Sequence, residues 1–367
     1  MSAFGPVLAS VLVLGAAGAC GADGDASGDA AMPFDAAAQL DGPGPDDAAD
    51  DDAGASGDSN TASDDGGVPP PDAGTDPPAR GVVHVVLFTH IEDNTPAGML
   101  GSAMSRTAYT RLRARLVEMA ELAARYGLPW VLQPDWRFLE AALLYEDAAT
   151  TADTGGRNLF VHLRDELGVA IDPHSHENGG YNYTDVAYLL ERLGVGGSTV
   201  IGGHIWDPAL PQFQQWDRFR APVAGERYPE ASWRGDILIG AGTPMHVNDP
   251  LASGVWRPRD RDRFFDDDPA GNVVAVGAWT RNLEGVRELV ALHEDGTVAP
   301  EQLLTASWNI GPSTLTSPTG LADVEAQVLL PLAALRDEGA VVVTDFTTLV
   351  DTWRRDYGAR SSLYRPL

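Results

Sequence analysis

Apolar residues recur along most of the chain with two spacings. In residues 109–126 they recur about every 3.6 positions and stop before Gly127, which is typical of an amphipathic helix that ends at a glycine. A short apolar run at 129–134 follows and predicts a strand. The same order recurs, so we predict further helices at 160–167, 186–193 and 324–335, strands at 169–173, 198–201 and 341–343, and a last helix around 349–353.

The alternation of helices with strands predicts the fold class. Parallel strands need a long crossover connection, usually a helix, so this order indicates an α/β protein with a parallel sheet. Both an open doubly wound sheet and a (β/α) barrel satisfy the pattern. Thr184 is the expected N-cap of the helix at 186–193.

Residues 205–280 break this alternation. They are rich in Trp, Pro, Arg and Asp, and a turn is expected at 268–272 before a strand at 273–276. We interpret them as an insertion over the carboxyl-end face of the sheet, where loops build binding sites in barrels.

Residues 21–80 have a different composition from the rest. They hold fifteen Asp, one Arg and no Glu or Lys among Gly, Ala, Ser and Pro, so they contribute half of the formal net charge of −28. Such a segment buries too little apolar surface to offset the entropy of ordering, and we predict a disordered linker before a domain at 81–367. The acidic chain should be soluble and should not bind nucleic acid, because it has no basic stripe. All 25 basic residues are Arg, which excludes chemistry that needs a lysine.

The first twenty residues resemble an export signal. Residues 7–19 are apolar and small, too short to cross a bilayer about 30 Å thick but suited to the core of a signal peptide. They end in Ala-Gly-Ala before Cys20, which resembles a bacterial lipoprotein cleavage box with Cys20 as the lipidated residue. The alternative is an ordinary secretory signal with an incidental cysteine. We expect a protein anchored to the outer membrane or cell surface only through Cys20, or else secreted.

Two predicted strands end in residues that can bind a metal ion. An apolar run at 84–91 leads into Glu92 and Asp93, and the run at 169–173 leads into His174 and His176. Carboxylate oxygen and imidazole nitrogen are the donors that a divalent transition ion prefers. Side chains alternate along a strand, so His90 shares a face with Glu92, and Asp93 can join Glu92 only if the strand has already ended. The plainer interpretation is a solvated carboxylate pair and two hydrogen-bonded histidines.

These segments resemble motifs of the polysaccharide deacetylase superfamily. His90-Ile91-Glu92-Asp93-Asn94 is similar to its Thr-Phe-Asp-Asp-Gly motif, and His174-Ser175 is similar to the start of its His-(Ser/Thr)-x-x-His motif. The resemblance covers residues 81–367 and implies an irregular, incomplete (β/α) barrel, a divalent metal ion with zinc as the first candidate, and an acetylated carbohydrate as substrate. It implies Glu92 as the catalytic base and Asp93 and His174 as metal ligands. Residue 178 is Asn rather than the second histidine, so His176 would supply the third ligand.

The resemblance extends to two other positions. Arg257, in Trp-Arg-Pro-Arg at 256–259, lies where the family has an arginine that orients the base, although Arg234 competes for this role and Arg257 could instead pair with Asp260 or Asp262. The late general-acid histidine of the family has no match: residues 304–309 occupy its place, and His293 lies at a predicted helix end. His204 or His246 could replace it.

A few remaining residues have less specific interpretations. Asp172 could orient an imidazole as a hydrogen-bond acceptor, whereas Glu177 is expected to be a solvated loop residue. The acidic run at 266–268 lacks the spacing of a calcium loop. Trp130 is expected in the core, and four other tryptophans could stack on sugar rings if exposed, namely Trp136, Trp206, Trp216 and Trp233.

Three functions remain open from the sequence. The first is a monomeric, metal-dependent carbohydrate deacetylase-like hydrolase at the cell surface. The second is a surface protein that binds glycans without catalysis, which Asn178 and the missing late histidine favour. The third is a glycosidase, which would need a second carboxylate facing Glu92, and Asp172 and Asp207 are the candidates.

Overall fold

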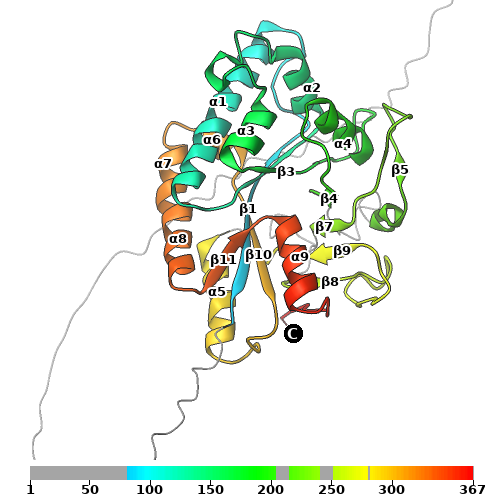
Figure 1. Ribbon diagram of the computed structural model, residues 1–367, viewed down its shortest axis with the longest axis vertical. Coiled ribbons are helices and arrows are strands. Elements are labelled where there is room, and N and C mark those ends of the chain that lie inside the picture. The colour runs from blue at the N-terminus through cyan, green and yellow to red at the C-terminus, as the bar shows by residue number, and fades with distance from the viewer. Residues whose placement is uncertain (1–80, 204–214, 240–250, 280–281, 367) are drawn as a thin grey trace, which may run out of the picture. The chain divides into compact units, whose positions relative to one another are not determined.

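The computed structural model describes residues 81–203, 215–239, 251–279 and 282–366 (Figure 1). The predicted linker, Cys20, Asp207, and the histidines His204 and His246 lie outside these residues. No helix in the described ranges combines the length and the apolar composition that crossing a bilayer requires.

The larger sheet contains the strand that precedes Glu92. Its order is β10 (Leu304–Asn309), β1 (Val83–Ile91), β2 (Val131–Pro134) and β3 (Ala170–Ile171), and β11 (Val341–Thr344) pairs with the first half of β1. All of these pairs are parallel, which confirms the predicted α/β class. Three of the strands predicted from apolar runs, at 129–134, 169–173 and 341–343, are therefore present.

The smaller sheet is built mainly from the stretch interpreted as an insertion. Its order is β4 (Val200–Ile201), β7 (Ile237–Ile239), β9 (Val274–Val276) and β8 (Val255–Trp256), and only the β8–β9 pair is antiparallel. Gly271 N donates to Asp268 O over 2.7 Å, so the turn expected before β9 is present. A short hairpin joins β5 (Val223–Ala224) and β6 (Ser232–Trp233). Strands of two or three residues are too short to show a periodic pattern, which is why the sequence did not reveal β7 and β8.

Contacts at both ends of the two sheets connect the strands into a ring. A parallel bridge between His174 and Gly202 joins the continuation of β3 to that of β4. At the other end, Thr305 Oγ1 in β10 donates to Gly277 O over 2.7 Å and accepts from Gly254 N over 2.7 Å. The parallel strands thus follow one another in the order β10, β1, β2, β3, β4, β7 and β9, as an irregular barrel requires.

The side chains of β1 alternate between two hydrophobic clusters. Val83, Val85 and Leu87 pack in the cluster that contains the side chains of α1, α2 and α3, whereas Val86 and Phe88 pack in a second cluster with residues of β7 and β9. The second cluster also contains Phe346, Leu349 and Trp353 of α9. Both faces of β1 are therefore buried, and the strand reads as a continuous apolar run.

Six of the helices in the described residues, α1 to α5 and α9, begin after a residue whose side chain caps them. The helices are α1 (Ala103–Arg125), α2 (Trp136–Tyr145), α3 (Leu159–Leu167), α4 (Tyr183–Arg192), α5 (Leu283–Glu294), α6 (Pro312–Thr316), α7 (Gly320–Val324), α8 (Leu330–Asp337) and α9 (Phe346–Asp356). The other helical segments are the 3-10 helices η1 (Ala152–Thr154) and η2 (Gln215–Arg220) and the π-helical η3 (Glu325–Leu329). Gly127 and Gly168 adopt positive φ of 62° and 67° after α1 and α3, so the predicted helix ends are confirmed.

The predicted N-cap of α4 is wrong by two residues. Asn182 caps the helix: its side chain accepts from Asp185 N, and the Asp185 carboxylate accepts from Asn182 N. Thr184 lies inside the helix, and its hydroxyl donates to Val223 O over 2.8 Å. The reciprocal pair satisfies two backbone N–H groups, so a capping box prevails over a lone threonine.

Candidate metal centre

The carboxyl ends of β1, β2 and β3 bring polar side chains together. Strand β1 ends at Ile91, so Glu92 lies beyond it, and His174 and His176 follow β3. Glu92 Oε2 lies 3.0 Å from His174 Nε2 and 3.4 Å from His176 Nε2. Parallel strands end on the same edge, which explains why residues more than eighty positions apart meet here.

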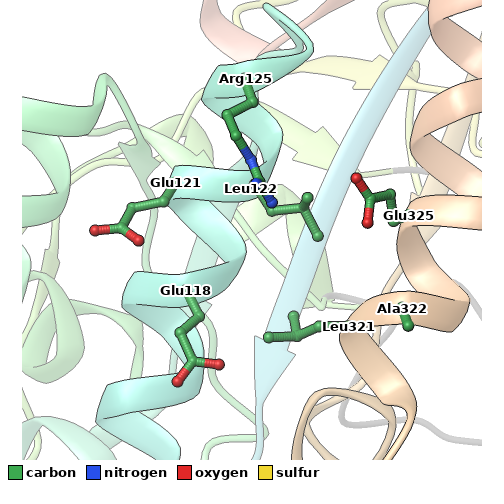
Figure 2. A pocket seen from close by; sticks show the side chains of 7 residues that line it. All are labelled: Glu118, Glu121, Leu122, Arg125, Leu321, Ala322 and Glu325. Carbon is green, nitrogen blue, oxygen red and sulfur yellow. The ribbon is translucent and has the colours of Figure 1, made fainter.

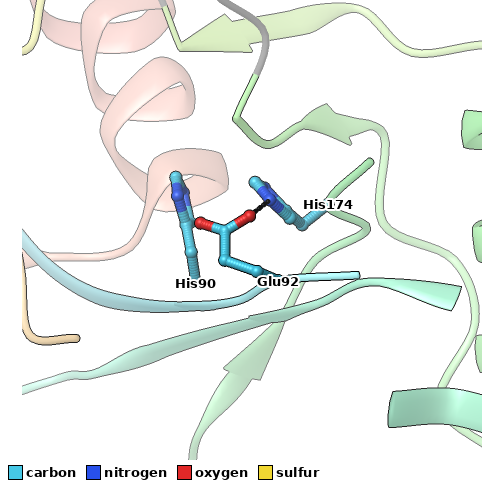
Figure 3. Close-up of side chains that lie close together, drawn as sticks. All are labelled: His90, Glu92 and His174. Atoms are coloured by element: carbon cyan, nitrogen blue, oxygen red, sulfur yellow. Dashed lines mark hydrogen bonds and ion pairs between the residues drawn. The ribbon is translucent and has the colours of Figure 1, made fainter. Parts of the chain in front are cut away.

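Two groups of donor atoms share His174. The first contains His90, Glu92 and His174, and Figure 3 shows the Glu92 carboxylate between the two rings. The second contains Asp135, His174 and His176. Within each group, the donor atoms all lie within 4.8 Å of one another. Two of the three predicted ligands, His174 and His176, are therefore brought together, and Glu92 lies beside both.

Asp93 belongs to neither group of donors found among the described residues. Its carboxylate accepts a hydrogen bond from Asn178 Nδ2 instead, and Asn178 Oδ1 accepts from Trp136 Nε1 over 3.2 Å. Asn178 thus connects the loops that follow β1, β2 and β3. Asn178 stands where the family motif has its second histidine, and it donates to Asp93, the carboxylate that the motif assigns to the metal.

Asp135 is a functional candidate that the sequence patterns did not single out. It follows β2 directly and caps α2, and its side chain is buried. Burial raises the pKa of Asp135 to about 7, more than the nearby His174 imidazole lowers it. The signal was available, because a carboxylate directly after an apolar strand is the pattern that identified Glu92.

His90 is the second candidate that was not assigned a role. Its ring stacks on that of His174, with centroids 4.2 Å apart and planes inclined by 30°. Its Nε2 is buried and forms no hydrogen bond with the described residues. The signal in this case was the alternation in β1, which places His90 and Glu92 on the same face of the strand.

The backbone around His174 leaves no room for side chains. A Cβ at Gly203 would lie 2.1 Å from the His174 ring, and a Cβ at Gly202 would lie 2.7 Å from Gln133 Oε1. The φ of Gly203 is also positive, at 74°. Glycine is therefore required at both positions, and their close approach fixes the orientation of the His174 ring.

Glu92 and His174 shift each other's pKa values toward the charged forms. Burial alone would raise the pKa of Glu92, but the His174, His176 and His90 imidazoles together hold it well below its ordinary value. Burial would lower the pKa of His174, and the Glu92 carboxylate, 3.0 Å away, raises it instead. Glu92 is therefore ionised at neutral pH and carries the negative charge that a metal ion or a protonated imidazole would pair with.

The residues present fit a divalent transition ion. Each group offers two imidazoles and one carboxylate, a donor set that zinc binds in open catalytic sites. Two buried ring nitrogens, His90 Nε2 and His174 Nδ1, form no hydrogen bond with the described residues, although such atoms are costly to leave unsatisfied.

The predicted arginine lies elsewhere. Arg257 Nη2 is 3.0 Å from Asp267 Oδ2, and its guanidinium lies over the Trp353 ring at 5.4 Å. Its partner is thus neither Asp260 nor Asp262, and its contacts do not reach the donor groups. The competing Arg234 lies 3.5 Å from Asp236.

Two acidic residues beside the histidines have their own partners. Glu177 was expected to be solvated, but it forms an ion pair with Arg218, and its backbone has a φ of 54°. Asp172 accepts from Ser198 Oγ over 2.6 Å and from Gln133 Nε2 over 3.4 Å. Burial raises the pKa of Asp172 to about 6.

The tryptophans divide by burial. Trp130 is in the core, as expected, and Trp216 is also fully buried, so neither can stack on a sugar. Trp136 is partly exposed and stacks on Tyr181 with centroids 4.5 Å apart. His293 is the penultimate residue of α5, as expected.

A pocket lies apart from this centre. It is lined by residues of α1, α7 and η3, among them Glu118, Glu121, Arg125 and Glu325 (Figure 2). None of its lining residues belongs to either donor group, so the pocket is not part of the candidate metal centre.

Comparisons with known proteins find low similarity to solved structures. No family model matches the chain, and no curated protein does. The PuuE allantoinase is 11% identical over 78% of this chain and 98% of its own, with a TM-score of 0.44. A probable polysaccharide deacetylase from Pseudomonas aeruginosa PAO1 is 11% identical over 78% of this chain and 97% of its own, with a TM-score of 0.43. A 4-alpha-glucanotransferase from Thermococcus litoralis is 10% identical over 74% and 40%, with a TM-score of 0.43. At such TM-scores these likenesses carry no conclusion about chemistry, which depends on the geometry of the donor groups.

Proposed function

We propose that this protein is a metal-dependent hydrolase that removes acetyl groups from carbohydrate. The observation that carries the proposal is the cluster after β1, β2 and β3, in which an ionised carboxylate, Glu92, lies within 3.4 Å of two imidazole nitrogens. Such a cluster combines the donors for an ion with a separate base, which is what metal-assisted hydrolysis needs.

Asp135, His174 and His176 are the proposed metal ligands, with Asp135 in the role that the family motif gives to Asp93. All three follow parallel strands of one sheet, and the shared edge fixes their separation. A bound divalent ion, zinc in our proposal, would polarise the acetyl carbonyl and make water more acidic.

Glu92 is the proposed base. It is ionised and partly exposed, with 38% of its side chain accessible, so water can reach it. It would take a proton from the water that attacks the acetyl carbon and then deliver it to the departing sugar oxygen or nitrogen. A carboxylate that serves in both steps would remove the need for the late histidine that the sequence lacks.

An aromatic side chain beside the centre favours a sugar as substrate, and the charge of the chain disfavours nucleic acid. Trp136 adjoins Asp135, and its partly exposed indole offers a surface for a sugar ring. The net charge of −28 opposes nucleic-acid binding. We propose export and attachment through a lipid on Cys20, with the protein acting as a monomer at the cell surface.

Glycan binding without catalysis is the second candidate. It is favoured by the hydrogen bond from Asn178 to Asp93, which engages the carboxylate that the family motif assigns to the metal. In this case the same face would bind sugar, and Glu92 would have no water to activate.

Acetate release distinguishes the two candidates. The full-length chain, loaded with zinc, is incubated with acetylated xylan and with chitin oligosaccharides, and free acetate is measured beside a metal-stripped sample. Release that requires the metal supports the hydrolase. Glycan binding by calorimetry without acetate release at any metal loading supports the second candidate instead.

A further inference from the structure

The two donor groups share one histidine and have the same composition. Each consists of two imidazoles and one carboxylate, with His174 common to both. The type of ligand therefore does not by itself make a divalent ion bind one group more tightly than the other. We propose that a single ion has two alternative positions in this protein: the His176 position, formed by Asp135, His174 and His176, and the His90 position, formed by His90, Glu92 and His174.

The His90 position is a built site. The His90 backbone lies near the carboxyl end of β1, where it pairs with Gln133 of β2 on one side, and on the other side His90 N donates to the Asn309 Oδ1 of β10 over 3.4 Å. The ring is held against His174 at 4.2 Å. Its Nε2 is inaccessible and has no hydrogen-bond partner among the described residues, so a metal ion would satisfy a nitrogen that is otherwise left unpaired.

The two positions differ in what they do to Glu92. In the His176 position the ion leaves the Glu92 carboxylate free to accept a proton. In the His90 position Glu92 would itself be a ligand, and the adjacent positive charge would make its carboxylate a weaker base. This consequence rests on the proposed function, because it takes Glu92 as the base. The His90 position is then a resting state, and the distribution of the ion between the two positions regulates the activity.

Cobalt binding tests the two positions without measuring activity. Full-length wild-type chain and three variants, Asp135→Asn, His90→Phe and the double variant, are titrated with Co²⁺ alone, and both the stoichiometry and the visible absorption spectrum are recorded. Asn is also a good N-cap, so Asp135→Asn preserves the start of α2. Phe keeps an aromatic ring over His174 and removes both nitrogens. Circular dichroism and the melting temperature establish that each variant is folded.

We expect each single variant to retain one Co²⁺ and to differ from the other in its spectrum, because each leaves one position intact. The double variant should bind at least about tenfold more weakly than either single variant, the lower end of the loss expected even for an outer supporting group. His162→Phe is the matched control, since His162 lies in α3 and belongs to neither group. It should bind like the wild type.

Three results overturn the inference. If Asp135→Asn alone abolishes binding, the His90 position does not hold an ion, whereas the proposed hydrolase stands. If the double variant binds like Asp135→Asn, the His90 nitrogens are not ligands. A wild-type chain that binds no Co²⁺ and no Zn²⁺ overturns the proposed function together with the inference.

Discussion

The Glu92 carboxylate can bind either a proton or a metal ion, and the side chains around it determine which of the two it binds. Three imidazoles surround it and keep it ionised despite burial. Two of them, His174 and His176, belong to the proposed working position of the ion, and His90 belongs to the alternative position. At the scale of single residues, the proposed function therefore depends on how the imidazoles around Glu92 are divided between the two donor groups.

Replacing Glu92 by Gln separates binding from catalysis. Gln keeps the shape of the side chain but cannot act as a base, so acetate release should fall by about 10²–10⁴-fold. The number of zinc ions bound per chain should stay the same as in the wild type. Elemental analysis and the acetate assay measure the two effects. Near wild-type turnover in this variant would assign the base to another residue.

Asp93→Asn is the matched comparison for the metal ligands. Asp93 contacts Asn178 and lies outside both donor groups, so this variant should keep its zinc, whereas the family motif implies that it loses it. Loss of zinc from Asp93→Asn with retention by Asp135→Asn would restore the motif assignment.

His84, in β1 but away from the centre, should make stability depend on pH. Burial lowers its pKa from 6.5 to about 4, more than the Asp356 carboxylate raises it, so the folded state resists protonation more than the unfolded state. The free energy of unfolding is therefore unaffected by His84 above pH 6.5. As pH falls from 6.5 toward 4, the unfolded state binds a proton that the folded state does not, and the free energy of unfolding decreases by at most on the order of 3 kcal/mol. Urea unfolding of wild type and His84→Phe at several pH values measures the difference. Equal pH dependence in both proteins would contradict the assignment.

At the scale of elements, caps and strand ends determine where the site residues lie. The cap of α2 is Asp135, so the residue that starts the helix also belongs to one of the two donor groups. The cap of α4 belongs to a network in which Asp185 also accepts from the backbone N–H groups of residues 226–228. One buried carboxylate thus holds both the start of α4 and the loop between β5 and β6.

Asn182→Ala should lower the free energy of unfolding by about 1 kcal/mol, within a range of about 0.5–2 kcal/mol for loss of an N-cap. Asn182→Ser is the control, because a serine hydroxyl can still accept from Asp185 N. It should lower the free energy of unfolding by only a few tenths of the loss in Asn182→Ala. Chemical denaturation measures both. Equal stability of the Ala and Ser variants would show that the cap of α4 contributes nothing.

At the scale of the whole molecule, a few polar contacts join the two sheets. Thr305 in β10 forms hydrogen bonds with the backbone of Gly254, which precedes β8, and of Gly277, which follows β9. The bridge between His174 and Gly202 joins the opposite edges of the two sheets, next to the candidate metal centre. The ring of strands and the position of His174 therefore depend on the same long-range contacts.

Thr305→Val should destabilise the protein by about 1–3 kcal/mol, because it keeps the volume but leaves buried backbone groups of Gly254 and Gly277 without a partner. Thr347→Val, at an exposed position of α9, is the matched control and should lie within about 0.5 kcal/mol of wild type. Thermal and urea unfolding give both values. A Thr305→Val protein as stable as the control would show that this contact does not close the ring.

The sequence by itself determined the α/β class, most helix ends, and His174, His176 and Glu92 as one cluster. Those features follow from local causes: periodic apolar residues, glycines that accept positive φ, and polar residues placed directly after buried strands. Only the tertiary structure decided that Asp135 and His90 join the cluster, that Asp93 faces Asn178, and that Arg257 pairs with Asp267. Local patterns placed Asp135 after a strand and His90 on the face of Glu92, but which of these side chains meet depends on strand pairing and loop paths between residues far apart in the chain.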